Sequence, residues 1–217
     1  MPRNPKKPAR KLPSSIPLPP LPSKPPVFPK DSNGVRYWLI KTEPLSRIDP
    51  RSGNDVKFSL EDLSKVDREP WTGVRNYEAK NNMLNMAKDD VCLVYHSNCP
   101  NPGIVGVSRI ASDHCKPDPL QYDRKSGYFD AKSTKETPRW WCPDVSFACR
   151  LRRKVSLAEL KDNPDFKEMS LVKRGRLSVS PVRESEFKAI LKIQEEGDGE
   201  EGEVEFDCNV KGMRIHD

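Results

Sequence analysis

Alternating apolar and polar positions predict a series of β-strands between residues 35 and 193. The clearest alternation runs through Val35–Lys41, where Tyr37 and Leu39 fall on one face and Trp38 and Ile40 on the other. A glycine within a strand often marks a bulge or a close approach, and Gly106 is predicted to do so. Four further segments have strand-like patterns: Val91–Ser97, Ile104–Ala111, Val145–Val155 and Leu177–Val182.

Helix signals lie between these strands. Ser59 with Asp62 and Ser156 with Glu159 have the spacing of capping boxes, so a helix is predicted after each serine. Apolar positions at helical spacing predict two longer helices, and the polar segment between residues 112 and 138 is predicted to be a long surface loop with room for one helical turn. The longer helices are Arg75–Ala87 and Glu184–Ile193. Strands with interspersed helices, without a repeated βαβ unit, predict an α+β fold or a small barrel.

Composition divides the chain of 217 residues into three parts. Residues 1–34 hold 11 of the 22 prolines and seven Lys or Arg against one acid, and residues 194–217 hold nine acids against two basic residues. Neither segment has enough apolar surface to offset the entropy of ordering, so both are predicted to be disordered tails. The remaining residues 35–193 form one predicted domain.

Charge indicates the kind of partner. The N-terminal tail, the domain and the C-terminal tail carry about +6, +7 and −7, respectively. A basic domain favours a polyanionic partner, although surplus Lys and Arg also occur on ordinary soluble surfaces. No apolar run approaches the roughly 20 residues of a membrane-spanning helix, so no membrane partner is expected. The N-terminal basic residues are interpreted as a nuclear-import segment, or else as a nucleic-acid arm or a solvated linker: Arg3, Lys6, Lys7, Arg10 and Lys11.

Candidate catalytic and metal-binding patterns are weak. Cys92 and His96 would share a strand face, but four strand residues separate them by roughly 13 Å, and no paired zinc-ligand spacing occurs. Neither a Gly-x-Ser-x-Gly nucleophile motif nor a phosphate-binding glycine pattern is present in the sequence. We therefore expect no metal, no cofactor and no enzymatic activity.

Aromatic residues stand beside Lys, Arg and Asn at the predicted strand ends and turns. Trp38 precedes Lys41, Trp71 precedes Arg75 and Asn76, and Tyr95 precedes Ser97. Aromatic rings stack on any nucleobase, and neighbouring amide, hydroxyl and guanidinium groups can read the edge of the base. This composition is compatible with a pocket for an extruded base, but each Trp alone is equally well explained by core packing.

Several longer motifs in this order resemble EVE domains, and specifically the eukaryotic thymocyte nuclear protein 1 family: YWLIKTEP, FSLEDL, WTGVRNYEAKNNMLNM, YHSNCPNPGIVGV, PRWWCPDV, SLAELK and RLSVSPV. The resemblance runs from about Tyr37 to Leu191. It implies a PUA-like fold, in which a small, partly closed β-barrel is flanked by helices. It also implies a largely nuclear, non-catalytic reader of modified bases, with modified cytosine in DNA favoured over RNA.

The resemblance further implies which residues form the base- or nucleic-acid-binding site. Three positions depart from the family pattern, namely Pro143, Arg183 and Leu120, and none of them belongs to the implied site. Arg183 replaces a small hydroxyl residue and is expected to weaken the cap of the last helix. The implied site residues are Trp38, Lys41, Thr42, Glu43, Trp71, Gly73, Val74, Arg75, Asn76, Tyr95, His96, Ser97, Arg139, Trp140, Arg176, Leu177 and Ser178.

The resulting hypothesis is a reader in which Trp71 or Trp38 stacks on the base. Polar groups of Asn76, Ser97 and either Lys41 or Glu43 would read the edges of the base. Two alternatives remain open. One is an enzyme acting on a modified nucleotide, with His96 or Glu43 as general acid–base, and the other is an adaptor in which the proline-rich tail binds SH3- or WW-like partners and the acidic tail binds basic proteins.

Overall fold

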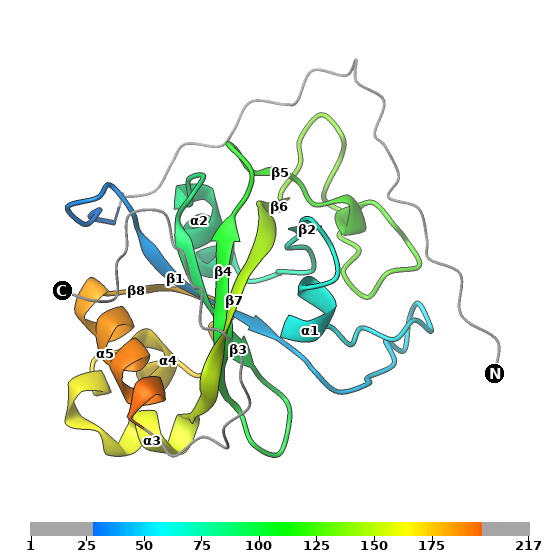
Figure 1. Ribbon diagram of the computed structural model, residues 1–217. Coiled ribbons are helices and arrows are strands. Elements are labelled where there is room, and N and C mark those ends of the chain that lie inside the picture. Colours follow the sequence, from blue (N-terminus) through cyan, green and yellow to red (C-terminus); the bar gives the residue numbers. More distant parts are fainter. Residues whose placement is uncertain (1–27, 197–217) are drawn as a thin grey trace.

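The computed structural model describes residues 28–196, which form a curled sheet covered by helices on both faces (Figure 1). The six-stranded sheet has the order β2-β7-β4-β3-β1-β8. Its strands are β1 (Tyr37–Thr42), β2 (Glu69–Pro70), β3 (Val91–His96), β4 (Gly103–Ile110), β7 (Asp144–Ser156) and β8 (Val179–Val182). The predicted α+β fold with a partly closed barrel is confirmed.

The curl of the sheet follows from one long strand and several register shifts. β1 and β3 are parallel, whereas the other neighbouring pairs are antiparallel. β7 is 13 residues long, and its pairing with β4 shifts register between Ile104 and Gly106, where a bulge was predicted. A Cβ atom at Gly106 would lie 2.4 Å from the Leu60 side chain and 2.6 Å from the Cys149 carbonyl oxygen. Glycine therefore permits the first helix to pack closely on the sheet.

Two hydrophobic cores fill the two faces of the sheet, as the alternation in β1 predicted. Tyr37 and Leu39 pack with α3 (Leu157–Asp162), α4 (Ser170–Lys173) and α5 (Glu184–Glu195), which gather together in Figure 1. Trp38 and Ile40 pack on the opposite face with α1 (Leu60–Leu63) and α2 (Tyr77–Asn85). Because successive strand residues point to opposite faces, one strand contributes to both cores.

The helix starts confirm the predicted capping signals. Ser59 and Asp62 form a capping box at α1, and Ser156 and Glu159 form another at α3. α2 begins after Asn76, whose side-chain oxygen accepts the Ala79 N–H at 3.0 Å. At α5, Arg183 offers no side-chain acceptor, but the Glu186 carboxylate accepts both the Arg183 N–H at 2.8 Å and its Nε–H at 2.9 Å. These bonds compensate in part for the expected weak cap.

Short elements were missed where the sequence lacks a pattern long enough to detect. Besides β2 and α4, they include β5 (Lys116–Pro117), β6 (Trp141–Cys142) and the 3₁₀ turn η2 (Pro164–Phe166). β5 pairs with β6, and the 3₁₀ turn η1 (Pro119–Gln121) lies in the predicted loop, where one helical turn was expected. No helix within residues 28–196 is long and apolar enough to cross a membrane.

Both ends of the domain extend further than composition indicated. The Phe28 ring packs edge-on against Trp38, with ring centroids 5.5 Å apart, and Asp31 accepts the Tyr37 hydroxyl at 2.7 Å. Residues 28–34, assigned to the tail by their composition, therefore pack on the domain. At the other end, the Gln194 side chain accepts the Arg152 N–H at 2.8 Å. The rest of the two predicted tails and the basic N-terminal residues lie outside the described residues.

Candidate functional site

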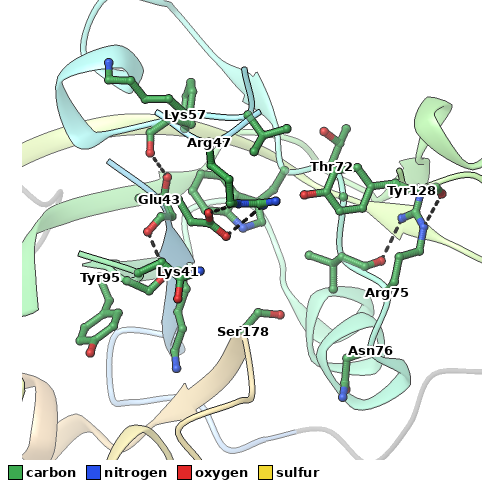
Figure 2. Close-up of a pocket in the computed structure, with 18 of the residues that line it drawn as sticks. Lys41, Glu43, Arg47, Lys57, Thr72, Arg75, Asn76, Tyr95, Tyr128 and Ser178 are labelled. Atoms are coloured by element: carbon green, nitrogen blue, oxygen red, sulfur yellow. Dashed lines mark hydrogen bonds and ion pairs between the residues drawn. The ribbon is translucent and has the colours of Figure 1, made fainter. Parts of the chain in front are cut away.

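A cavity of about 1010 Å³ opens where the parallel strands β1 and β3 end. Lys41 and Thr42 line it from β1, and Tyr95 and Ser97 from the end of β3, while Ser178 precedes β8 (Figure 2). The opposite wall is formed by the segment between β2 and α2, together with residues of two long loops. A volume of this size accommodates a small molecule or a nucleobase with part of its sugar.

The strand ends are fixed to one another by backbone-directed hydrogen bonds. Ser97 donates its N–H and its hydroxyl to the Thr42 carbonyl, at 2.8 and 3.0 Å, respectively. The Thr42 hydroxyl donates to the Phe58 carbonyl. Lys41 donates from Nζ to the Gly175 carbonyl at 2.6 Å and lies 5.3 Å from the centre of the Tyr95 ring. Burial lowers the pKa of Lys41, but its carbonyl and aromatic neighbours suit the ammonium form.

The turn after β2 is held against Tyr128, which comes from the long loop. Gly73 has a φ of 83°, and a Cβ atom there would lie 3.1 Å from the Tyr128 ring. Both observations demand glycine, because other residues are strained at positive φ and would displace the ring. The Gly73 N–H donates to the Asp118 carboxylate at 2.9 Å, so the turn is tied to the 3₁₀ turn η1 as well.

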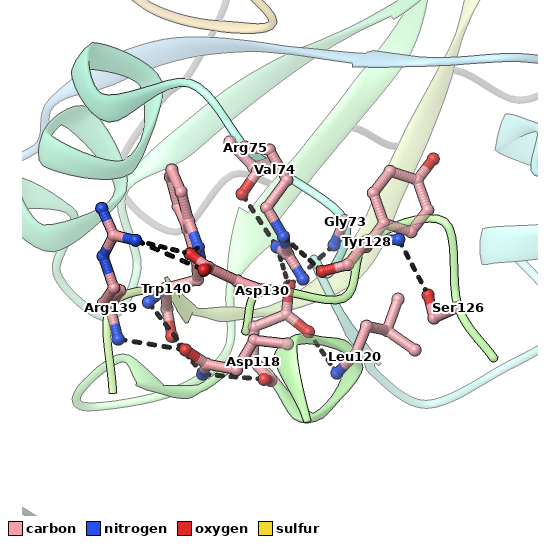
Figure 3. A network of polar contacts seen from close by, with 11 residues as sticks. Gly73, Val74, Arg75, Asp118, Leu120, Ser126, Tyr128, Asp130, Arg139 and Trp140 are labelled. Carbon is pink, nitrogen blue, oxygen red and sulfur yellow. Dashed lines mark hydrogen bonds and ion pairs between the residues drawn. The ribbon is translucent and has the colours of Figure 1, made fainter. Parts of the chain in front are cut away.

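Arg75 is the most extensively anchored side chain of this wall (Figure 3). Its guanidinium donates to the Asp118 carboxylate at 2.6 Å and to the Tyr128 carbonyl at 2.7 Å. Its Cζ also lies 5.5 Å from the centre of the Tyr128 ring and 5.4 Å from that of the Trp140 ring. Asp118 is 1% exposed, so this ion pair is largely shielded from solvent. The guanidinium is thus held in a fixed position on the cavity wall.

Trp71 supplies aromatic surface between the two walls. Its side chain is 7% exposed, and its ring lies edge-on to Phe58, with centroids 6.1 Å apart. The Trp71 N–H donates to the Pro143 carbonyl at 2.9 Å. Pro143, one of the departures from the family pattern, therefore helps to position this tryptophan. With Phe58, Tyr95 and Tyr128, Trp71 gives the cavity four aromatic side chains.

Basic groups outnumber acidic ones on the cavity wall. Glu43 is held by Arg47, with an Nε–O distance of 2.6 Å, and Lys57 pairs with Asp62 at 3.0 Å. Arg176 also lines the cavity and forms no ion pair with a residue in the range 28–196. The lining includes five basic and three acidic residues: Lys41, Arg47, Lys57, Arg75 and Arg176 against Glu43, Asp55 and Glu69.

Most of the residues implied by the resemblance come together in this cavity. They are Lys41, Thr42, Glu43, Trp71, Gly73, Val74, Arg75, Asn76, Tyr95, Ser97, Arg176 and Ser178. The structure does not place Trp38, His96, Arg139, Trp140 or Leu177 on its lining.

Trp38 was one of two candidates, with Trp71, for stacking on a base, and the structure corrects this expectation. Its side chain is fully buried on the face opposite Tyr37, and its Nε1–H donates to Asp90 at 2.9 Å. Leu177 is likewise a core residue, 5% exposed, in the same cluster. Trp38 lies near the start of β1, where it packs against Phe28, whereas the cavity opens at the end of the strand, beside Lys41 and Thr42.

His96 has a structural partner instead of a cavity position. Its Nε2 accepts the Leu60 N–H at 3.2 Å and so fixes the start of α1. Burial, followed by the charge of Lys154, lowers the pKa of His96. A neutral imidazole is required for Nε2 to accept this hydrogen bond.

Arg139 and Trp140 lie just outside the cavity, behind Arg75. The Trp140 Nε1–H donates to Asp130 at 2.7 Å, and Arg139 pairs with the same carboxylate at 3.0 Å. These residues therefore support the Arg75 wall and continue beyond it to the outer surface of the domain.

Sequence reasoning missed the residues that the loops contribute, notably Arg47, Phe58, Leu120 and Tyr128. Leu120, one of the three departures from the family pattern, lies outside the motifs that imply the site but lines the cavity. Phe58 directly precedes the predicted capping box, and Tyr128 follows Gly127 in the predicted loop. These local signals indicate that an aromatic residue lies at the boundary of an element. They do not indicate which distant residue its ring contacts.

Comparison with known proteins defines the class. The EVE domain family matches residues 36–193, and the chain belongs to this family. Among its relatives is thymocyte nuclear protein 1 of Gallus gallus, 40% identical over 170 residues, which cover 74% of this chain and 69% of the relative. The Homo sapiens protein of the same name is 37% identical over 169 residues, covering 73% and 74%.

Solved structures agree with this assignment. A crystal structure of human THYN1 protein in complex with 5-methylcytosine-containing DNA superposes with a TM-score of 0.71 at 37% identity, covering 75% of this chain and 99% of that one. A hypothetical protein from Leishmania major gives a TM-score of 0.67 at 40% identity, with coverages of 76% and 98%. The resemblance drawn from the sequence motifs is confirmed.

Proposed function

We propose that this protein binds nucleic acid and holds one modified base, rotated out of its strand, in the cavity. The observation that carries the proposal is the combination of aromatic rings, the anchored guanidinium of Arg75 and a carbonyl- and hydroxyl-bearing strand edge around a space of about 1010 Å³. A base buries its flat faces against aromatic side chains, while polar groups recognise its edge. Trp71 is the proposed stacking residue, and Ser97, Ser178 and Asn76 are the proposed edge-reading residues.

Modified cytosine in DNA is the proposed ligand. A relative with 37% identity has been crystallised with DNA that contains 5-methylcytosine. A single added methyl group provides only about 1–3 kcal/mol of discrimination in an apolar pocket. We therefore expect a modification that carries a polar group, such as hydroxymethyl, to be selected more sharply than methyl alone if the cavity offers it a hydrogen bond.

The proposed role is binding without catalysis. The two candidate acid–base residues are already engaged: His96 accepts the Leu60 N–H, and Glu43 is held by the guanidinium of Arg47. Neither arrangement leaves the group poised to exchange a proton with a ligand in the cavity. A test is incubation with modified nucleosides and oligonucleotides, in which product formation would contradict this part of the proposal.

We further propose a nuclear location, with an import receptor that binds the basic N-terminal residues. The relatives carry the name thymocyte nuclear protein 1. Deletion of residues 1–27 leaves the packed Phe28 in place, so it tests the segment without disturbing the domain. Loss of nuclear accumulation of a tagged protein supports the import role, and unchanged accumulation contradicts it.

The cavity itself is tested by replacing Trp71 with leucine, which is also apolar but has no aromatic ring. Trp71→Leu is expected to weaken binding of the modified oligonucleotide by about 1–3 kcal/mol, the usual contribution of a base–aromatic stack. Trp38→Leu is the matched control, because it removes a buried indole outside the cavity. Both variants must first be shown to be folded by circular dichroism. Equal affinities of folded Trp71→Leu and wild type would contradict the proposed cavity.

A further inference from the structure

A surface next to the cavity combines an exposed aromatic ring with two cations. Tyr77, the first residue of α2, is 50% exposed. Its ring lies against Trp140, with centroids 4.9 Å apart and planes tilted by 34°. We call Tyr77, Lys80 and Arg139 the Tyr77 surface. None of the three lines the cavity.

The ring of Tyr77 positions both cations. Lys80 Nζ lies 5.1 Å from the ring centre, and the Arg139 Cζ lies 5.6 Å from it. Arg139 also donates a hydrogen bond to the Tyr77 hydroxyl. Cation–π contacts hold a charged group in place without neutralising it, so both side chains keep their positive charge.

Positive charge exceeds negative charge on this surface. Arg139 pairs with Asp130, but that carboxylate also accepts the Trp140 Nε1–H. Lys80 has no recorded acidic partner within residues 28–196. Its pKa is lowered by burial and then by the nearby charge of Arg139, which means that the two cations repel each other. An anion placed between them would relieve this repulsion.

The Tyr77 surface adjoins the Arg75 wall of the cavity through Trp140, whose ring lies 5.4 Å from the Arg75 Cζ and 4.9 Å from the Tyr77 ring. Tyr77 follows directly after Arg75 and Asn76, which line the cavity. Figure 3 shows Arg75, Trp140, Asp130 and Arg139 in one polar network. A base rotated into the cavity stays covalently bound to the phosphates on either side, so those phosphates must lie close to the rim of the cavity.

We propose that the Tyr77 surface binds a backbone phosphate that flanks the base held in the cavity. This inference rests on the proposed function and adds a second contact to it. Lys80 and Arg139 donate to the phosphate oxygens, and Tyr77 fixes the spacing between the two donors. Because phosphates are the same beside every base, this contact adds affinity and register but no selectivity for the modification.

The test is the salt dependence of binding in Lys80→Ala, measured with matched modified and unmodified oligonucleotides. Loss of one phosphate contact lowers the slope of log K against log salt concentration by about 0.9 for duplex DNA. Lys161→Ala is the control, since Lys161 is exposed on α3, which packs in the core on the other face of the sheet from α2. Lys80→Arg keeps the charge and is expected to retain the wild-type slope.

The result expected is a smaller slope in Lys80→Ala alone, with the same fold loss of affinity for modified and unmodified strands. A slope equal to those of wild type and Lys161→Ala would overturn the inference, even if selectivity for the modification persists. Conversely, a reduced slope without any selectivity in the wild type would support the phosphate contact and contradict the modified-base cavity. The two failures are therefore distinguishable.

Discussion

Arg75 shows how one side chain links packing to the site. Its guanidinium joins the turn after β2 to Asp118 and to the loop that carries Tyr128. Asp118 in turn accepts the N–H groups of Gly73, at 2.9 Å, and Leu120, at 2.8 Å. These hydrogen bonds hold the Arg75–Asp118 pair in one geometry. Removing either partner would leave an uncompensated charge in a largely buried position.

Asp118→Asn is expected to lower the free energy of unfolding by about 3 kcal/mol, as is usual when one partner of a buried pair is removed. The carboxamide cannot neutralise Arg75, although its oxygen can still accept an N–H. Glu78→Gln, which breaks the exposed pair with Arg174, is the control and should cost much less. Chemical denaturation measures both. Similar small losses in the two variants would show that the Arg75–Asp118 pair is not an important constraint.

His96 gives the protein a pH-dependent stability. Its pKa is lowered below the usual 6.5 by burial and then by Lys154, so the unfolded chain takes up the proton first. The stabilisation is therefore complete above about pH 6.5 and is lost as the pH falls through the lower pKa of the folded state.

Between pH 7 and pH 5, the free energy of unfolding of the wild type should fall more steeply than that of His96→Gln. The variant has no titrating group at this position. His114→Gln serves as the control, since His114 is exposed, and it should follow the wild-type curve. Urea denaturation at several pH values gives the comparison. Parallel curves for wild type and His96→Gln would refute the assigned role of His96.

At the scale of elements, the segment between β2 and α2 is a rigid turn that shapes one wall. The Trp71 N–H is bound to Pro143, Gly73 adopts a positive φ, and Asn76 caps the helix that follows. Each constraint acts on backbone geometry, so the side chains of Trp71 and Arg75 are presented from a fixed frame.

Gly73→Ala should destabilise the fold by roughly 1–2 kcal/mol, the cost of a left-handed conformation for a residue with a Cβ atom. It should also weaken ligand binding, because the new methyl group would displace the Tyr128 ring. Gly175→Ala is a matched control: it also lies on the cavity lining, but it has free space and no positive φ. Thermal denaturation and a binding titration test both effects. Equal behaviour of the two variants would argue against the turn as a constraint.

The same elements show which parts could be predicted from sequence. The two capping boxes and the alternation in β1 are local signals, and the structure confirms them. Trp38 does not line the cavity because it lies near the start of β1, whereas Lys41 and Thr42 lie at the end of the strand. In contrast, Phe58 and Tyr128 come from segments far apart in the sequence. Only the folded domain brings both of them to the lining of the cavity. No local pattern encodes such a contact.

At the scale of the whole molecule, the cavity lies between the two cores of the sheet. Tyr95 belongs to the core covered by α3, α4 and α5, whereas Trp71 belongs to the core covered by α1 and α2. The cavity therefore has walls that belong to separate packed layers, and both layers must be intact for it to keep its shape. Under the proposed function, its basic lining and the adjoining Tyr77 surface both contact a polyanionic strand.

The central claim is that the cavity recognises a modified base. The most direct measurement is a fluorescence titration of the wild-type protein, at two salt concentrations, with matched oligonucleotides that carry cytosine, 5-methylcytosine or 5-hydroxymethylcytosine, each as DNA and RNA. We expect an affinity difference between modified and unmodified DNA that persists at both salt concentrations, because base recognition does not depend on counterion release. Equal affinities that fall together as salt increases would contradict the claim and leave only attraction to the phosphate backbone.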